Sequence, residues 1–215
     1  MASDLLNMIG NDERVLWRGK PDKKCFLLES IFNPLLPFAL IWGLIDFGIM
    51  GAALSSKDGV GEVGIFLVFF FALHLMPVWI YLGGVLMSWK RYDNTSFLIT
   101  DKAIYVSGGV FACTYEMKPF AELSHINIHR GIFDQYLGVG DVVSMCEHAS
   151  YNSHSRHSHG AGITICDIKD YQKVFALVKE LQTNIYSDTM FPNDLRPREN
   201  HGYRTKYTGG DISKY

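Results

Sequence analysis

The chain has 215 residues, with 20 lysine and arginine residues against 22 aspartate and glutamate residues. The formal net charge of −2 gives no electrostatic reason to expect nucleic-acid binding, and a content of 48% apolar residues excludes a disordered chain. The mean hydropathy of +0.06 is high for a soluble protein, and nearly all of the excess lies between Pro34 and Trp89, which predicts a small membrane protein with a folded domain attached.

Residues 1–33 are expected to form a cytoplasmic N-terminal segment, on the basis of the basic residues described below. A cleavable signal peptide is not expected, because Met1–Asn11 lacks a basic n-region. Two apolar runs follow, and residues 34–54 and 64–88 are predicted to be transmembrane helices. The first run spans roughly 31 Å at ~1.5 Å per residue, which is the thickness of the hydrocarbon core of a bilayer. Both runs are apolar all round, whereas core helices of soluble proteins carry a polar stripe. Residues 34–89 therefore read as a transmembrane hairpin.

The orientation of this hairpin is predicted from the basic residues beside it. The polar loop Ser55–Glu62 is short, so the two helices must be antiparallel, and its one basic residue is Lys57. Lys90 and Arg91 follow the second helix. The segment before the first helix carries Arg14, Arg18, Lys20, Lys23 and Lys24. A multi-pass protein of the plasma membrane with both termini in the cytoplasm is therefore expected.

Two ionisable residues interrupt the apolar runs, Asp46 in the first and His74 in the second. Their distances from the loop between the helices place both at a similar depth, roughly 12–15 Å below the outer surface. Ionisable groups in hydrocarbon are costly and usually face a partner. The two side chains are therefore predicted to share a proton or a hydrogen bond as an intramembrane polar pair, either as a structural clasp or in proton or ion handling.

Residues 90–186 change to a period of two, which is typical of strands with one buried face. The period then becomes 3.6 and predicts a final helix with Asp167 as its N-cap, whereas residues 187–215 have no period and are expected to be a flexible tail. The six predicted strands contain Phe97 and Ile99, Ile104 and Val106, Phe111 to Met117, Ile126 and Ile128, Val143 and Met145, and Ile163 and Ile165.

The order of these segments resembles a bacterial pleckstrin-homology (PH) family of small membrane-anchored proteins. The matching features are Leu16–Pro21 before the first apolar run, Ile99–Ala103, Ser107–Gly109, Leu137–Val142 and Asp167-Ile168. This resemblance implies a membrane α + β fold, in which the two-helix hairpin precedes a seven-stranded, PH-like β-barrel capped by a C-terminal α-helix. One strand is then missing from the six above, and it is expected near residues 151–160 or before Phe97.

Phosphoinositide binding, which the PH resemblance suggests, needs several basic residues in the loop between the first two strands. That loop is Thr100-Asp101-Lys102, with one base beside an acid, and residues 90–186 hold 9 basic and 10 acidic residues. Specific phosphoinositide binding is therefore not expected.

The most unusual stretch of the domain is the histidine-rich loop, residues 146–159. His148, His154, His157 and His159 could converge on Zn²⁺, Ni²⁺ or Cu²⁺, or the loop could be polar because nothing packs there. The four cysteines form no CxxC pair and are read as free thiols, while His125 and His129 are expected on a solvent-facing strand side.

No catalytic motif is present at useful spacing, so no enzymatic activity and no cofactor are expected. The predicted function is a non-catalytic membrane protein that presents a cytoplasmic PH-like domain as an interaction or assembly module. Its expected partners are the lipid bilayer and other membrane proteins or copies of itself, with no nucleic acid. The alternative function is a metal-binding or metal-responsive membrane module that uses the histidine-rich loop.

Overall fold

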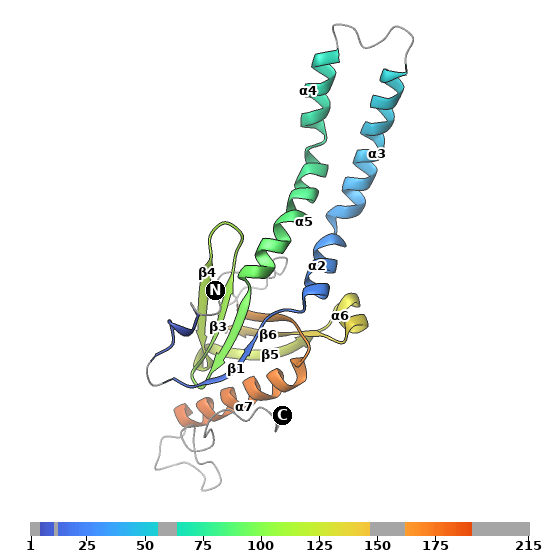
Figure 1. The fold of residues 1–215 in the computed structure, drawn as a ribbon. Helices are drawn as coiled ribbons and strands as arrows, with labels where there is room; N and C mark the ends of the chain where they lie inside the picture. Colours follow the sequence, from blue (N-terminus) through green and yellow to red (C-terminus); the bar gives the residue numbers. More distant parts are fainter. Residues whose placement is uncertain (1–4, 11–12, 56–63, 147–161, 191–215) are drawn as a thin grey trace. The chain divides into compact units, whose positions relative to one another are not determined.

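The structure is a computed structural model that describes residues 5–10, 13–55, 64–146 and 162–190 (Figure 1). The chain forms two compact units. One unit combines residues 1–26 with residues 91–215, and we call it the β-domain. The other unit, residues 27–90, is the helical unit.

The β-domain contains two antiparallel sheets, of four and three strands. The first sheet has the order β1-β2-β3-β4, with β1 at Val15–Gly19, β2 at Ser96–Thr100, β3 at Ala103–Gly108 and β4 at Thr114–Pro119. The second has the order β5-β6-β7, with β5 at Leu123–His129, β6 at Gly140–Cys146 and β7 at Gly162–Ile168. The 3₁₀ turn η2 (Phe120–Glu122) connects the two sheets. Antiparallel sheets and a final helix fit a PH-like domain.

Strand β1 brings the number of strands in the described residues to seven, and it comes from the segment that the sequence pattern assigned to a separate N-terminal region. The other expected place for a further strand, residues 151–160, lies outside the described residues. It pairs with β2, so that Trp17 lies opposite Ile99 and Gly19 opposite Phe97. Trp17 is buried, and its indole ring lies over Gly19, where a Cβ atom would be 2.3 Å from the ring. The β-domain is therefore built from two pieces of chain that flank the helical unit.

The core of the β-domain lies between the sheets and the last helix, α7 (Tyr171–Met190). One face of α7 is buried and packs in this core through Val174, Leu177, Val178 and Leu181. This spacing of three and four residues places the four side chains on one side of a helix. A second, smaller cluster forms where Leu5 packs with Leu98, Ala103 and Tyr105. Strand β2 is therefore buried on both of its faces, although its alternating sequence predicted one.

Three local predictions are wrong in the β-domain. The final helix begins at Tyr171, and Asp167 lies in β7 with a φ of 54°, so it is not the N-cap. The helix also continues to Met190, past the predicted start of the tail at 187. Phe111 lies in the turn between β3 and β4, because the chain turns at Gly109, whose φ of 124° suits glycine.

A short helix, α6 (Ile132–Leu137), was not predicted by the sequence pattern. Its six residues are too few to show a helical period. Gly138 ends this helix in the left-handed conformation, with a φ of 70°. Gly138 is therefore a helix C-cap.

The helical unit contains most of α2 (Lys23–Ile31) and the helices α3 (Leu35–Leu54), α4 (Gly64–His74) and α5, which begins at Met76 and ends at Asn94. Within the described residues, one helix segment, Leu35–Ala53, is long and apolar enough to cross a membrane. It agrees with the predicted helix 34–54. The predicted helix 64–88 is wrong as a continuous helix, because α4 and α5 meet at an angle of 54°.

Candidate functional site

The break between α4 and α5 is explained by Pro77, in the first turn of α5. Proline has no amide N–H, and its ring clashes with the carbonyl group four residues earlier, which is that of Leu73. The chain turns at Leu75, whose carbonyl oxygen accepts hydrogen bonds from the amides of Val78 (2.9 Å) and Trp79 (3.1 Å). The amide of Val78 therefore does not continue the α-helical pattern to His74.

Two tryptophan side chains donate to carbonyl groups at this break. Trp42 of α3 donates from Nε1 to the carbonyl oxygen of His74, at 2.8 Å. Trp79 of α5 donates from Nε1 to the carbonyl oxygen of Ala72, at 3.1 Å. A broken helix in apolar surroundings must satisfy its carbonyl groups from side chains. The two indoles thus replace hydrogen bonds that a continuous helix would form.

The same break carries the Asp46–His74 pair. Nδ1 of His74 lies 2.9 Å from Oδ1 and 3.0 Å from Oδ2 of Asp46, so the structure brings the two predicted residues together. Asp46 is buried, while the side chain of His74 is 39% exposed. The imidazole stacks on Trp42, with 5.0 Å between ring centroids, and on Phe70, with 5.1 Å. The imidazole of His74 is therefore held by aromatic faces on its ring and by the carboxylate of Asp46 at its edge.

The residues predicted as metal ligands, His148, His154, His157 and His159, lie outside the described residues. The metal interpretation of that loop therefore stays a prediction. His125 and His129 lie exposed on β5, and Nδ1 of His129 is 3.7 Å from Oδ2 of Asp141.

The sequence pattern missed a buried polar cluster formed by Cys25, Asp134 and Asp167. The thiol of Cys25 donates to Oδ1 of Asp134 at 3.0 Å, and the amide of Gly131 donates to Oδ2 of the same carboxylate at 2.7 Å. The sulfur and carboxylate oxygens of the three residues lie within 4.8 Å of one another, a donor set that Zn²⁺ accepts. Both oxygens of Asp134 already receive hydrogen bonds, so the contacts present join α6 to the start of α2. No motif signals this cluster, because 109 positions separate Cys25 from Asp134.

The loop Thr100–Lys102, which the sequence pattern placed between the first two strands, joins β2 and β3 because β1 precedes them, and its own side chains hold it. Oγ1 of Thr100 accepts hydrogen bonds from the amides of Lys102 (3.2 Å) and Ala103 (3.0 Å). Oδ1 of Asp101 accepts one from the amide of Arg14, at 3.0 Å. A carboxylate in this loop opposes a phosphate ligand electrostatically.

Among the described residues of the β-domain, Tyr105 and Asp22 have shifted pKa values. Burial raises the pKa of Tyr105 to about 12, and the hydrogen bond from its hydroxyl to Glu13 (3.0 Å) adds to the rise. Burial alone would raise the pKa of Asp22, but the amide of Cys25 and the ammonium group of Lys169 outweigh it, and the pKa lies below the ordinary value. Neither group changes charge near neutral pH, so both are structural.

Comparison with known proteins identifies one family. The model of the bacterial PH domain family matches residues 45–182. No curated protein matches the chain. No solved structure matches it either. Since the match covers more than half of the chain and includes β2 to β7, the chain belongs to the bacterial PH domain family.

Proposed function

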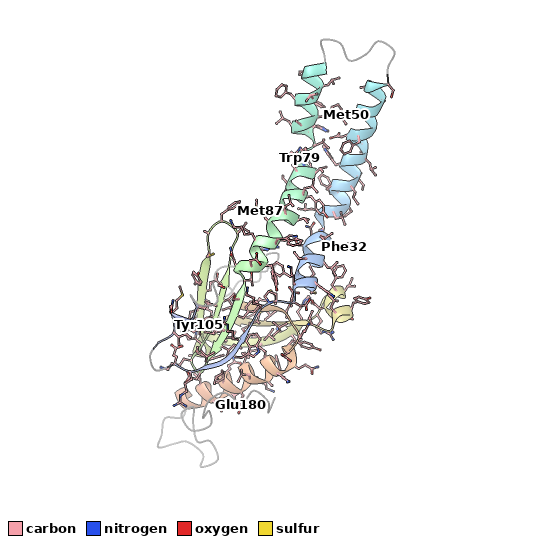
Figure 2. All side chains as sticks on the ribbon, viewed as in Figure 1. Phe32, Met50, Trp79, Met87, Tyr105 and Glu180 are labelled. Carbon is pink, nitrogen blue, oxygen red and sulfur yellow. The ribbon has the colours of Figure 1, made fainter. Side chains whose placement is uncertain are left out.

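We propose that this protein is a non-catalytic integral membrane protein, in which the helical unit spans the bilayer twice and the PH-like β-domain is a cytoplasmic interaction module. The observation that carries the membrane anchor is the exposure of apolar side chains along α3, α4 and α5 (Figure 2). Leu44 is 71% exposed, Leu73 78% and Leu86 72%. Soluble monomers rarely expose contiguous apolar patches larger than a few hundred Å². A bilayer would cover these side chains.

The second span is the bent pair α4 and α5. A broken helix is tolerated in a membrane where side chains satisfy the freed carbonyl groups, and Trp42 and Trp79 donate to two carbonyls at this break. The Asp46–His74 pair gives each ionisable group a partner, as apolar surroundings require. These contacts support two spans rather than one.

The proposed module function rests on the PH-like fold and on the edges of its sheets. Strands β4 and β5 lie at sheet edges, where backbone groups can pair with a strand of another protein. The expected partners are other membrane proteins or copies of this chain. For self-association, Gly48 and Ala52 of α3 offer small residues one turn apart, and the Cβ position of Gly48 faces open space.

Membrane fractionation tests the anchor. The full chain is expected in the membrane pellet and should stay there after extraction with alkaline carbonate, which strips peripheral proteins. Release into the supernatant would contradict the anchor. Crosslinking in native membranes, followed by mass spectrometry, tests the module and should recover protein partners. Turnover of a substrate together with the absence of any crosslinked protein would contradict it.

A further inference from the structure

The β-domain carries two strongly exposed apolar features. On α6, Ile132 is 84% exposed and Tyr136 is 86% exposed, and their spacing of four residues places them on one helix face. In the turn between β3 and β4, Phe111 is 83% exposed. Among the described large apolar residues of the β-domain, these three are the most exposed. These three side chains are not part of the core of the domain.

Hydrogen bonds and ring contacts place both features beside the points where the chain leaves the β-domain. Nδ2 of Asn94, at the end of α5, donates to the carbonyl oxygen of Gly109 in the β3–β4 turn, at 3.1 Å. The thiol of Cys25, in the first turn of α2, donates to Asp134 of α6 at 3.0 Å. The rings of Phe26 and Tyr92, 5.8 Å apart, hold the start of α2 next to the end of α5. Phe111 and α6 therefore flank the two connections to the helical unit, and α7 lies at the other end of the domain from the β3–β4 turn (Figure 1).

Basic side chains gather between these apolar features. The ammonium groups of Lys20 and Lys23 lie 5.9 and 5.8 Å from the centre of the Tyr92 ring. The guanidinium group of Arg91 lies 5.4 Å from the centre of the Phe26 ring. Lys24 is exposed beside Lys23 on α2.

Two acidic residues, Asp22 and Asp93, belong to the same stretches of chain. Asp22 is half-buried and pairs with Lys169 at 3.2 Å. The backbone carbonyl of Asp93 accepts a hydrogen bond from the ammonium group of Lys20, at 3.2 Å. In residues 20–24 and 91–93, three lysines are exposed against one exposed acid, Asp93.

We propose that this face lies on the bilayer surface, with Phe111, Ile132 and Tyr136 entering the interfacial region and the basic residues pairing with phosphates of anionic phospholipids. The proposal rests on the proposed membrane anchor and adds a second, lateral contact. Aromatic and aliphatic side chains around a basic centre are the combination by which peripheral segments bind anionic membranes. The covalent connections to the anchor keep this face near the bilayer.

The test uses the full chain reconstituted in nanodiscs of phosphatidylcholine, with or without phosphatidylglycerol, and with lipids that carry a nitroxide quencher on the headgroup. An environment-sensitive fluorophore is attached to an exposed cysteine introduced as Phe111→Cys or Ile132→Cys. Cys113 and Cys146 are first replaced by serine, while Cys25 and Cys166 stay because they are buried. The matched control label is Lys179→Cys, on an exposed position of α7. We expect strong quenching at the first two positions, stronger with phosphatidylglycerol, and little quenching at the control.

The contribution of charge is tested with Lys20→Gln/Lys23→Gln/Lys24→Gln, compared with Lys118→Gln/Lys173→Gln, which lowers the positive charge elsewhere on the domain. The first variant should abolish the extra quenching that phosphatidylglycerol causes, and the second should retain it. Co-elution with nanodiscs without quenching above the control would overturn this inference and leave the anchor standing. Failure to co-elute would overturn the anchor and this inference together. Quenching that does not depend on phosphatidylglycerol would overturn the role of the basic residues.

Discussion

Asp46 and His74 show how a pair of ionisable residues can fit into an apolar unit. The carboxylate is buried, and its oxygens lie 2.9 and 3.0 Å from Nδ1 of His74. A buried ion pair contributes little net stability compared with two apolar residues, but the loss of one partner leaves the other charge or dipole unsatisfied. The pair therefore makes single substitutions more harmful than a double one.

This asymmetry gives a prediction for the free energy of unfolding. Asp46→Leu or His74→Leu alone should each lower it by about 3 kcal/mol, whereas the double variant should lose much less than the sum. Thermal unfolding of the full chain in detergent micelles measures these differences. His74→Leu combined with Ser88→Ala, another buried polar position of the helical unit, serves as the control and should be additive. Additive losses in the Asp46/His74 cycle would contradict the interpretation of a coupled pair.

Asp22 contributes to the dependence of β-domain stability on pH. Its Oδ1 accepts hydrogen bonds from the amides of Lys24 (3.0 Å) and Cys25 (3.2 Å), so it caps α2, and its Oδ2 pairs with Lys169. The folded pKa is lowered, so the stabilisation by the carboxylate is fully present above the unfolded pKa of about 3.9. It is lost as the pH falls through the folded pKa.

Two substitutions of Asp22 separate the cap from the charge. Asp22→Ala should lower the free energy of unfolding by about 1 kcal/mol at neutral pH, since it removes the cap. Asp22→Asn keeps a capping oxygen and should lose less. In melting curves recorded from pH 7 down to below the folded pKa, the difference between wild type and Asp22→Asn should shrink with falling pH. A difference that stays constant over this range would exclude a stabilising charge.

At the scale of elements, the break between α4 and α5 is stabilised by side chains of the helical unit. Pro77 removes one helical hydrogen bond, and the indole N–H groups of Trp42 and Trp79 serve carbonyls beside the break. Helices α3 and α5 lie close together at Gly43 of α3, where a Cβ atom would be in ordinary contact, at 3.5 Å, with a methyl group of Val78. The bend therefore depends on residues from both arms of the hairpin.

The roles of Trp42 and Pro77 are predicted to be coupled. Trp42→Phe leaves the carbonyl oxygen of His74 without its indole donor and should lower the free energy of unfolding by about 1–2 kcal/mol. In a Pro77→Ala background the helix can continue, and the amide of Val78 can reach this carbonyl instead. The cost of Trp42→Phe should therefore be smaller there, as measured by thermal unfolding in micelles. The matched control is Trp89→Phe, at an exposed position of α5. If Trp42→Phe lowers the free energy of unfolding equally in both backgrounds, this explanation is wrong.

At the scale of the whole molecule, the helical unit is inserted between the first two strands of the β-domain. Gly19 and Phe97, near the two ends of the insertion, are directly paired in neighbouring strands. Because the two ends of the helical unit connect to neighbouring positions, the β-domain can fold around this insertion. The same pairing means that residues before and after the helical unit must lie on the same side of any membrane that it enters.

Labelling of single cysteines tests this topology. In a background without native cysteines, Ser56→Cys should react with an impermeant thiol reagent in intact cells, and Ser187→Cys should not. The reason is that the loop between the apolar runs has one basic residue, whereas both flanks are richer in them. Reaction of both positions after the cells are opened is the control. Labelling of Ser187→Cys in sealed cells would place the β-domain outside.

The sequence alone determined the elements that are long or strictly periodic. The apolar run 34–54 coincides with α3, and period-two alternation predicted six of the seven strands, since burial on one face imposes alternation on each strand. The resemblance to PH domains rested on turn residues in a fixed order, and the family match confirms the PH-like domain. These signals are local, so a linear pattern is enough to reveal them.

Only the tertiary structure decided which distant segments meet. Val15–Gly19 has no clear alternation and becomes β1 because its pairing with β2 and the burial of Trp17 complete the first sheet. The sequence pattern predicts Asp167 to be an N-cap. In the structure its amide donates a hydrogen bond to Oδ1 of Asp141, at 2.7 Å, and the residue lies within β7. The Cys25–Asp134 contact joins residues from either side of the helical unit. In each case the deciding interaction is made by a residue far along the chain, and no local pattern can encode it.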